Sequence, residues 1–167
     1  MKIFLIGFMG SGKTHWGEIW AKEGHIPFFD LDKLVEIDAD KTVADIFEKD
    51  GERYFRQKET DMLKTFTNKE NYILSCGGGA PCFNDNIQWM NEHGVTIYLQ
   101  ASPQYVYEKV IPELDKRPLL KNVNRAELLF FIEQKIKERE PFYKQAQFIL
   151  PASEVNAATL SILNFKS

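Results

Sequence analysis

Short apolar runs alternate with longer amphipathic stretches along this chain, a pattern that predicts strands interleaved with helices. Residues 2–6 (KIFLI) and 95–99 (VTIYL) are continuous apolar runs, as expected for strands buried on both faces of a sheet. Shorter runs predict three more strands, at residues 26–29, 72–75 and 147–150. Pro27 restricts the first of these three to a strand start or a sheet edge.

The stretches between the strands carry helix signals. Ser102 and Pro103 open one helix as its N-cap and first helical residue, and His93-Gly94 ends another. Residues 112–124 have mixed charge and little periodicity, so we expect a mobile loop there. Helices are expected at 12–22, 33–37, 42–48, 51–65, 84–92, from 102 onward, at 126–143 and after 150.

Five strands interleaved with helices predict a three-layer α/β/α fold around a doubly wound, five-stranded parallel sheet. The length of 167 residues predicts one domain that spans residues 1–167. In a sheet of this kind, ligands bind beyond the carboxyl ends of the strands. The residues that directly follow the strands are therefore the first candidates for chemistry.

The composition excludes several classes of protein. Hydrophobic residues make up 44% of the chain and charged residues 27%, and a net charge of -3 argues against nucleic-acid binding by bulk positive charge. No apolar run approaches the roughly 18 residues of a membrane span, so no membrane partner is expected. Residues 1–8 lack the cleavage-site pattern of a signal peptide. Cys76 and Cys82 have no histidine cluster nearby, which argues against a disulfide framework or zinc site and predicts buried, reduced thiols in a cytoplasmic protein.

The segment Gly7–Thr14 matches the phosphate-binding pattern G-x-x-x-x-G-K-[ST] between a predicted strand and a predicted helix. Glycines let the backbone curl so that several N–H groups point at one anion, and the helix that follows adds the positive end of its dipole. Lys13 can reach the β- and γ-phosphates, and the Thr14 hydroxyl can ligate Mg²⁺. The pattern predicts a nucleoside triphosphate bound by Gly10, Ser11, Gly12, Lys13 and Thr14.

Two carboxylates, Asp30 and Asp32, follow the predicted second strand. Asp30 is placed to hold Mg²⁺ through water, since this hard cation prefers oxygen ligands and keeps several waters. Asp32 is placed to accept or orient a substrate hydroxyl for attack on the γ-phosphoryl group. The alternative is that either aspartate simply caps the helix that follows.

Several ordered motifs resemble the shikimate kinase family. Besides the phosphate loop, they are Phe29-Asp30-Leu31-Asp32, the stretch from Ala44-Asp45-Ile46-Phe47 through Gly51-Glu52 to Phe55-Arg56-x-x-Glu59, the triple glycine Gly77–Gly79, Arg117-Pro118-Leu119-Leu120 and Arg139-Glu140-Pro141-Phe142-Tyr143. The matches run in family order from residue 2 to about residue 148, so they cover nearly the whole chain. The resemblance implies a nucleoside-monophosphate-kinase type of phosphate-loop fold, with a substrate-binding segment at about residues 31–60 and a mobile lid at about residues 112–124.

The resemblance also implies an activity, the phosphorylation of the 3-hydroxyl of shikimate by ATP with Mg²⁺ as cofactor. Shikimate and ATP would be the partners, and the family is typically monomeric. Guanidinium groups bind carboxylates bidentately, and the family's arginines for the shikimate carboxylate match Arg56 and Arg139. The family's ligands for the ring hydroxyls match Asp32 and the backbone of Gly77, Gly78 and Gly79, with the amide of Gly78 as the direct contact.

Two further positions concern the nucleotide. Arg117 matches the lid arginine that reaches over the transferring phosphoryl group, which makes it a catalytic candidate beside Lys13 and Asp32. Lys109 stands where many members carry an arginine that stacks on adenine, so base stacking is expected to be weaker here.

Some residues depart from the family pattern or have two interpretations. The family usually has threonine directly before the triple glycine, whereas this chain has Cys76 preceded by Ser75, which alters a polar side chain expected near Mg²⁺. Phe47 and Phe55 resemble apolar walls of the substrate pocket, although core packing would explain them nearly as well.

Two other functions stay open from the residues alone. One is another small-molecule kinase such as a gluconate kinase, whose substrate also carries a carboxylate. The other is a non-catalytic nucleotide-binding module. The changes at Cys76 and Lys109 would favour it, and the presence of Lys13, Thr14, Asp32 and Arg117 opposes it.

Overall fold

The computed structural model of this protein describes residues 1–116, 120 and 122–163. Over these residues the chain forms one five-stranded sheet in the order β2-β3-β1-β4-β5, and every strand pair is parallel. The strands are β1 Lys2–Ile6, β2 Phe28–Asp30, β3 Tyr72–Ser75, β4 Val95–Gln100 and β5 Phe148–Pro151. The predicted fold class is therefore confirmed.

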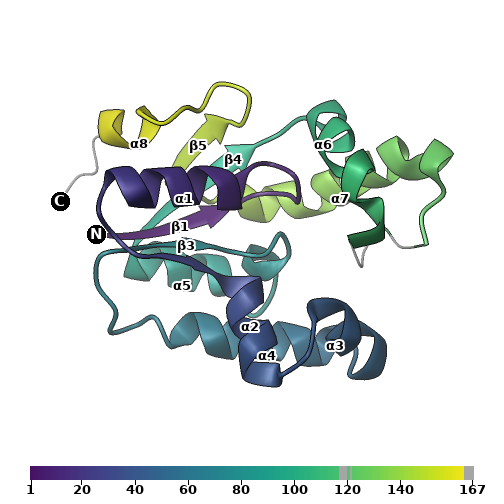
Figure 1. The fold of residues 1–167 in the computed structure, drawn as a ribbon, viewed down its shortest axis with the longest axis horizontal. Helices are drawn as coiled ribbons and strands as arrows, with labels where there is room; N and C mark the ends of the chain where they lie inside the picture. The colour runs from purple at the N-terminus through teal and green to yellow at the C-terminus, as the bar shows by residue number, and fades with distance from the viewer. Residues whose placement is uncertain (117–119, 121, 164–167) are drawn as a thin grey trace.

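Helices cover both faces of this sheet. Parallel strands require right-handed crossovers, and the connection from β1 to β2 runs in the opposite direction along the sheet from the later connections, so α1 lies on one face and α5 and α7 on the other (Figure 1). The helices are α1 Lys13–Glu23, α2 Leu31–Ala39, α3 Val43–Lys49, α4 Glu52–Lys64, α5 Asn86–His93, α6 Pro103–Val110, α7 Leu128–Tyr143 and α8 Thr159–Ile162, with 3₁₀ helices η1 Ala80–Cys82, η2 Ile111–Lys116 and η4 Arg125–Glu127.

The order of the strands creates a crevice in the middle of the sheet. The neighbouring strands β1 and β3 send their chains to opposite faces, which leaves a gap beyond their carboxyl ends. The phosphate loop leaves β1 at this point, and the triple glycine leaves β3. The topology therefore brings these two glycine-rich segments together.

The core accounts for the strongest sequence signals. Residues 3–6 of β1 are fully buried between the two helical layers, which explains their uninterrupted apolar run. Strand β2 lies at the edge of the sheet and begins at Phe28, after Pro27, as the position of the proline requires. Within the described part of the chain, no helix is long and apolar enough to cross a membrane.

Three local features differ from what the sequence predicts. After α6 the chain continues as η2, two short helical turns joined by a kink at Glu113, so the first part of the predicted loop is helical. Cys82 is only partly buried, whereas Cys76 is buried as predicted, and both thiols are free. The predicted helix at 126–143 starts as the 3₁₀ turn η4, where the Asn124 side chain accepts a hydrogen bond from the Ala126 N–H.

Gly17 allows α1 to approach the sheet closely, which gives a test of the packing. A Cβ at Gly17 would lie 2.5 Å from Phe28 Cε2 and 3.0 Å from Leu5 Cδ1. Overpacking of this kind outweighs the helix propensity gained, so Gly17→Ala should lower the free energy of unfolding by about 1–2 kcal/mol. Thermal unfolding measures the effect, with Glu18→Ala at an exposed position of the same helix as a near-neutral control. A rise in Tm for Gly17→Ala would contradict the packing described here.

Candidate active site

The phosphate loop forms the curled cradle that its sequence predicts. Gly7, Gly10 and Gly12 have φ values of 141°, 74° and 92°, which side chains disfavour. A Cβ at Gly7 would also lie 2.7 Å from the Leu99 carbonyl oxygen. The Lys13 ammonium donates hydrogen bonds to the Gly7 and Phe8 carbonyl oxygens at 2.8 and 2.9 Å, so its charge is held inside the curve of the loop.

Three side-chain oxygens meet beside the start of α1. The Thr14 hydroxyl donates to Asp30 Oδ2 at 3.0 Å, and Ser75 Oγ lies 3.4 Å from Thr14 Oγ1. Asp30 also caps α2, because its Oδ1 accepts from the Lys33 N–H at 3.3 Å. The capping and the metal-site interpretations of Asp30 are therefore compatible, with one carboxylate oxygen available for each.

This donor set fits Mg²⁺. The ion prefers oxygen ligands and is usually held by one or two protein groups together with waters and substrate phosphates. Among the described residues, no group of three or more His, Cys, Asp or Glu side chains could hold a metal ion by itself. Thr14 and Asp30 are thus suited to an ion that arrives with a nucleotide.

Two adjoining cavities open at the crevice between β1 and β3. The larger, of about 310 Å³, is lined by Met9, Gly10, Gly12, Lys13, Thr14, His15, Asp30, Asp32, Ser75, Cys76, Gly77, Gly78, Lys109 and Glu113. The smaller, of about 110 Å³, is lined by Met9, Asp32, Val43, Phe47, Phe55, Arg56, Glu59, Gly77, Gly78, Gly79 and Arg139. The cavities share Asp32, Met9 and the first two glycines of the triple glycine, so a ligand in one can touch a ligand in the other.

The two predicted arginines lie at the smaller cavity, although they come from helices far apart in the sequence. Arg56 on α4 is 6% exposed and Arg139 on α7 is 5% exposed. The Arg56 guanidinium carbon lies 5.2 Å from the centroid of the Phe55 ring, 5.8 Å from that of Phe47 and 4.5 Å from that of Phe83. These phenylalanines therefore contact the guanidinium that is predicted to bind the substrate, and Phe83 is a contact that no sequence pattern indicated.

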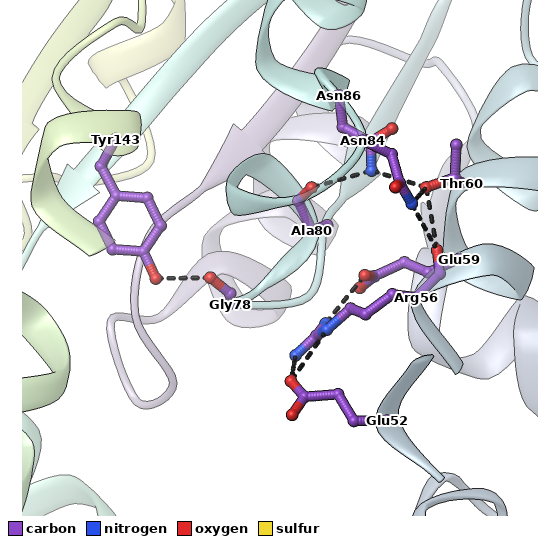
Figure 2. A network of polar contacts seen from close by, with 9 residues as sticks. All are labelled: Glu52, Arg56, Glu59, Thr60, Gly78, Ala80, Asn84, Asn86 and Tyr143. Carbon is purple, nitrogen blue, oxygen red and sulfur yellow. Dashed lines mark hydrogen bonds and ion pairs between the residues drawn. The ribbon is translucent and has the colours of Figure 1, made fainter. Parts of the chain in front are cut away.

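Glu59 holds Arg56 in place. Its Oε2 accepts from Arg56 Nη1 at 2.9 Å, and Glu52 Oε1 accepts from Nη2 at 3.2 Å (Figure 2). Glu59 is fully buried, so little water competes with its hydrogen bond to Arg56. The sequence placed Glu59 in a motif without a role, although its i,i+3 spacing from Arg56 on a predicted helix was a signal for this ion pair.

Two buried carboxylate oxygens at the cavity are without a partner inside the described chain. These are Asp32 Oδ1 and Glu59 Oε1, and a Cβ at Gly77 would lie 2.6 and 2.8 Å from them. Burial raises the pKa of Asp32 to about 6, with a further contribution from the negative charge of Asp30. Burial also raises the pKa of Glu59 to about 7, although the charge of Arg56 opposes this. An orphaned buried acceptor is costly, which favours a ligand that brings hydroxyl donors.

The triple glycine is anchored to α4 by a small polar network (Figure 2). The Asn86 amide donates to the Ala80 carbonyl oxygen at 2.9 Å and to Thr60 Oγ1 at 3.1 Å. The Thr60 hydroxyl donates in turn to the Arg56 carbonyl oxygen at 2.9 Å, and the Asn84 amide donates to Thr60 Oγ1 at 2.9 Å. The segment after the glycines is thereby tied to the helix that carries Arg56.

The two positions that depart from the family pattern, Cys76 and Lys109, lie in different parts of the site. Cys76 is buried and its thiol faces the Leu74 carbonyl oxygen, whereas the Ser75 hydroxyl lies beside Thr14. A hydroxyl is therefore present next to the predicted metal position. Lys109 lines the larger cavity, and its ammonium lies 5.5 Å from the centroid of the Tyr105 ring. Arg117 lies outside the described residues, as does part of the predicted lid at 112–124.

Comparison with known proteins agrees with this geometry. A family model described as shikimate kinase matches residues 9–164. This chain belongs to the shikimate kinase family. It is 42% identical over 155 residues to a shikimate kinase of Bacteroides fragilis, covering 93% of this chain and 87% of that protein.

Solved shikimate kinases also share the fold. The crystal structure of the shikimate kinase from Bacteroides thetaiotaomicron matches with a TM-score of 0.88 and 41% identity, over 93% of this chain and 89% of that chain. The shikimate kinase from Acinetobacter baumannii in complex with shikimate matches with a TM-score of 0.85 and 30% identity, over 96% and 88%.

The raised pKa of Glu59 predicts how stability depends on pH. In the unfolded chain a glutamate titrates near pH 4.3, so from about pH 4 to about pH 7 the folded state binds more protons than the unfolded state. The contribution of Glu59 to stability is therefore present at low pH and is lost as the pH rises through about 7. We expect Glu59→Gln to remove this part, so that the Tm of the variant falls less than that of the parent protein between about pH 5 and about pH 7.5.

Thermal unfolding without ligands measures this effect. Glu48→Gln, at an exposed position on α3, is the control and should keep the parent's dependence on pH. If Glu59→Gln and Glu48→Gln shift the profile equally, Glu59 is not the group responsible.

Proposed function

We infer that this chain transfers the γ-phosphoryl group of ATP to the 3-hydroxyl of shikimate, giving shikimate 3-phosphate and ADP. The observation that supports this most strongly is the meeting of two cavities at Asp32. One has a phosphate cradle, and the other has two buried guanidinium groups suited to a carboxylate. The smaller cavity lies below the usual size for drug-like ligands, which suits a compact cyclic acid.

Arg56 and Arg139 bind the substrate carboxylate in this proposal. Their planar forks pair with the two carboxylate oxygens, and burial strengthens each interaction because little water competes. Glu59 restrains the Arg56 guanidinium before substrate arrives, so little rotamer freedom is lost on binding. The acid group thus sets the orientation of the whole ring.

Asp32 and the triple glycine then place the hydroxyls. Asp32 Oδ1 is a buried, unpartnered acceptor at the junction of the cavities, where it can orient the attacking hydroxyl and receive its proton. The backbone amides of Gly77–Gly79, the one of Gly78 above all, donate to the ring oxygens.

The phosphate cradle supplies positive charge where negative charge develops. Gly10, Ser11 and Gly12 provide the backbone amides, and Lys13 neutralises the phosphoryl oxygens. Thr14 and Asp30 would hold Mg²⁺, and the ion when bound would neutralise charge on the β- and γ-phosphates. Lys109 lies on the nucleotide side and contacts the base by its charge and stem rather than by guanidinium stacking.

We further propose that the chain works as a monomer in the cytoplasm. All residues assigned above belong to one chain, so the site needs no second copy. The free thiols of Cys76 and Cys82 are compatible with a reducing compartment.

A coupled assay of ADP release tests the function directly. With Mg²⁺ and ATP, the folded protein should turn over with shikimate and not with gluconate. Absence of turnover on shikimate would reject the proposed reaction, and faster turnover on gluconate would replace it with another sugar-acid kinase.

Arg139 offers a test of the carboxylate site. Arg139→Lys keeps the charge but loses the fork, and hydrogen bonds to charged groups contribute about 1.5–3 kcal/mol, so the KM for shikimate should rise by about 10- to 100-fold. The KM for ATP should stay within about twofold. Arg125→Lys, at an exposed position before α7, is the control and should leave both constants unchanged. Equal behaviour of the two variants would exclude Arg139 from substrate binding.

Arg117 tests the expected lid. By analogy with arginine fingers, Arg117→Ala should lower kcat by up to about 10³-fold and raise the KM for ATP much less, since the charge acts on the transferring phosphoryl group. Steady-state kinetics separates the two effects. Near-normal turnover of the variant would remove Arg117 from the catalytic residues.

A further inference from the structure

All three carbonyl groups of the triple glycine accept a hydrogen bond. The Gly77 oxygen accepts from the Ala80 N–H at 3.0 Å, and the Gly79 oxygen accepts from the Cys82 N–H at 2.9 Å. The Gly78 oxygen is different, because its donor is a side chain, the Tyr143 hydroxyl, at 2.6 Å (Figure 2). Tyr143, which is far away in the sequence, therefore holds the middle carbonyl group of this loop.

The orientation of these carbonyls decides where the amides point. In a trans peptide the C=O and the following N–H point in opposite directions. The bond from Tyr143 to the Gly78 oxygen therefore directs the Gly79 N–H away from α7. Within the described chain, no hydrogen bond occupies the N–H groups of Gly78 and Gly79, and both residues line the smaller cavity. Fixing the carbonyls thus fixes two free donors at the substrate cavity.

Tyr143 also lies next to the carboxylate-binding arginine. Residues 139 and 143 are four apart on α7, so their side chains share a face of the helix. A Cβ at Gly78 would lie 3.2 Å from Arg139 Nη1, which shows that the guanidinium rests on the loop at this point. Burial raises the pKa of Tyr143, although the nearby positive charge of Arg139 opposes this rise. The hydroxyl therefore remains a protonated donor at neutral pH.

We propose that Tyr143 is a positioning residue for the acid substrate. Its hydroxyl and its place on α7 keep the Gly78–Gly79 peptide and the Arg139 guanidinium in a fixed arrangement relative to each other. The inference rests on the proposed function, since it assumes that the smaller cavity binds shikimate. Tyr143 lines neither cavity, so it acts on shikimate only through the loop and Arg139. Its loss should therefore weaken the binding of shikimate and leave the binding of ATP unchanged.

The matched substitution is Tyr143→Phe, with Tyr98→Phe as the control. Tyr98 is equally buried and its ring centroid lies 5.0 Å from that of Tyr143, but within the described chain its hydroxyl makes no hydrogen bond to the glycine loop. Tyr143→Phe leaves the Gly78 oxygen without its donor, so the KM for shikimate should rise about tenfold or more. The KM for ATP should change by less than about twofold, and Tyr98→Phe should change neither constant.

A rescue variant separates positioning from packing. Tyr143→p-aminophenylalanine keeps an N–H donor at the same place on the ring and should return the KM for shikimate toward the parent value. A folded Tyr143→Phe with parent kinetics would overturn the inference. So would equal increases in both KM values or a rise that the amino variant does not reverse. A Tyr143→Phe protein that does not fold would also overturn it, because the hydroxyl would then serve the stability of the whole chain rather than the position of the substrate.

The parent protein in the same assay distinguishes a failure of the proposed function from a failure of the role of Tyr143. If it does not phosphorylate shikimate, the proposed function fails. If it does, and Tyr143→Phe matches it, only the role of Tyr143 fails.

Discussion

The absence of side chains at Gly77–Gly79 is the constraint on which this structure depends. A Cβ on the first glycine would meet the buried carboxylates of Asp32 and Glu59, and one on the last would overlap the guanidinium of Arg56. Because these glycines have no side chains, the charged groups of α2 and α4 can pack directly against the backbone of the loop. The glycines also keep their own N–H groups exposed to the cavity. The same glycine loop thus lines both the cavity at the phosphate loop and the cavity at the two arginines.

Charge balance follows from the same contact. Arg56 and Arg139 are buried and would destabilise an empty site if they stood alone. Glu59 offsets this cost by pairing with Arg56, and Asp32 adds a second carboxylate in the cavity. Burial raises the pKa of both acids, to about 6 for Asp32 and about 7 for Glu59, while the positive charge of Arg56 opposes the rise in each case. The unpaired oxygens of these acids indicate where a polyol would bind.

Both arginine-bearing helices hold the glycine loop through neutral hydrogen bonds. On α4, Thr60 links the Arg56 carbonyl to Asn86, which holds the Ala80 carbonyl. On α7, Tyr143 holds the Gly78 carbonyl one turn after Arg139. The amides and the guanidinium groups are thus parts of one connected unit, and strain at either helix would reach the substrate through the loop. Rigid support of this kind keeps a small site accurate.

The sequence alone determined those features whose physics is local. The apolar run of β1, the glycine-rich loop after it and the two aspartates at and just after the end of β2 each carry their signal within a few residues, so the parallel sheet and the phosphate cradle were predictable. The tertiary structure decided the rest, because partners far apart in the chain leave no local pattern. The burial of the Arg56–Glu59 pair, the ring of Phe83 on the Arg56 guanidinium, and the bond from Tyr143 to Gly78 all depend on how α4, α7 and the segment after β3 pack together.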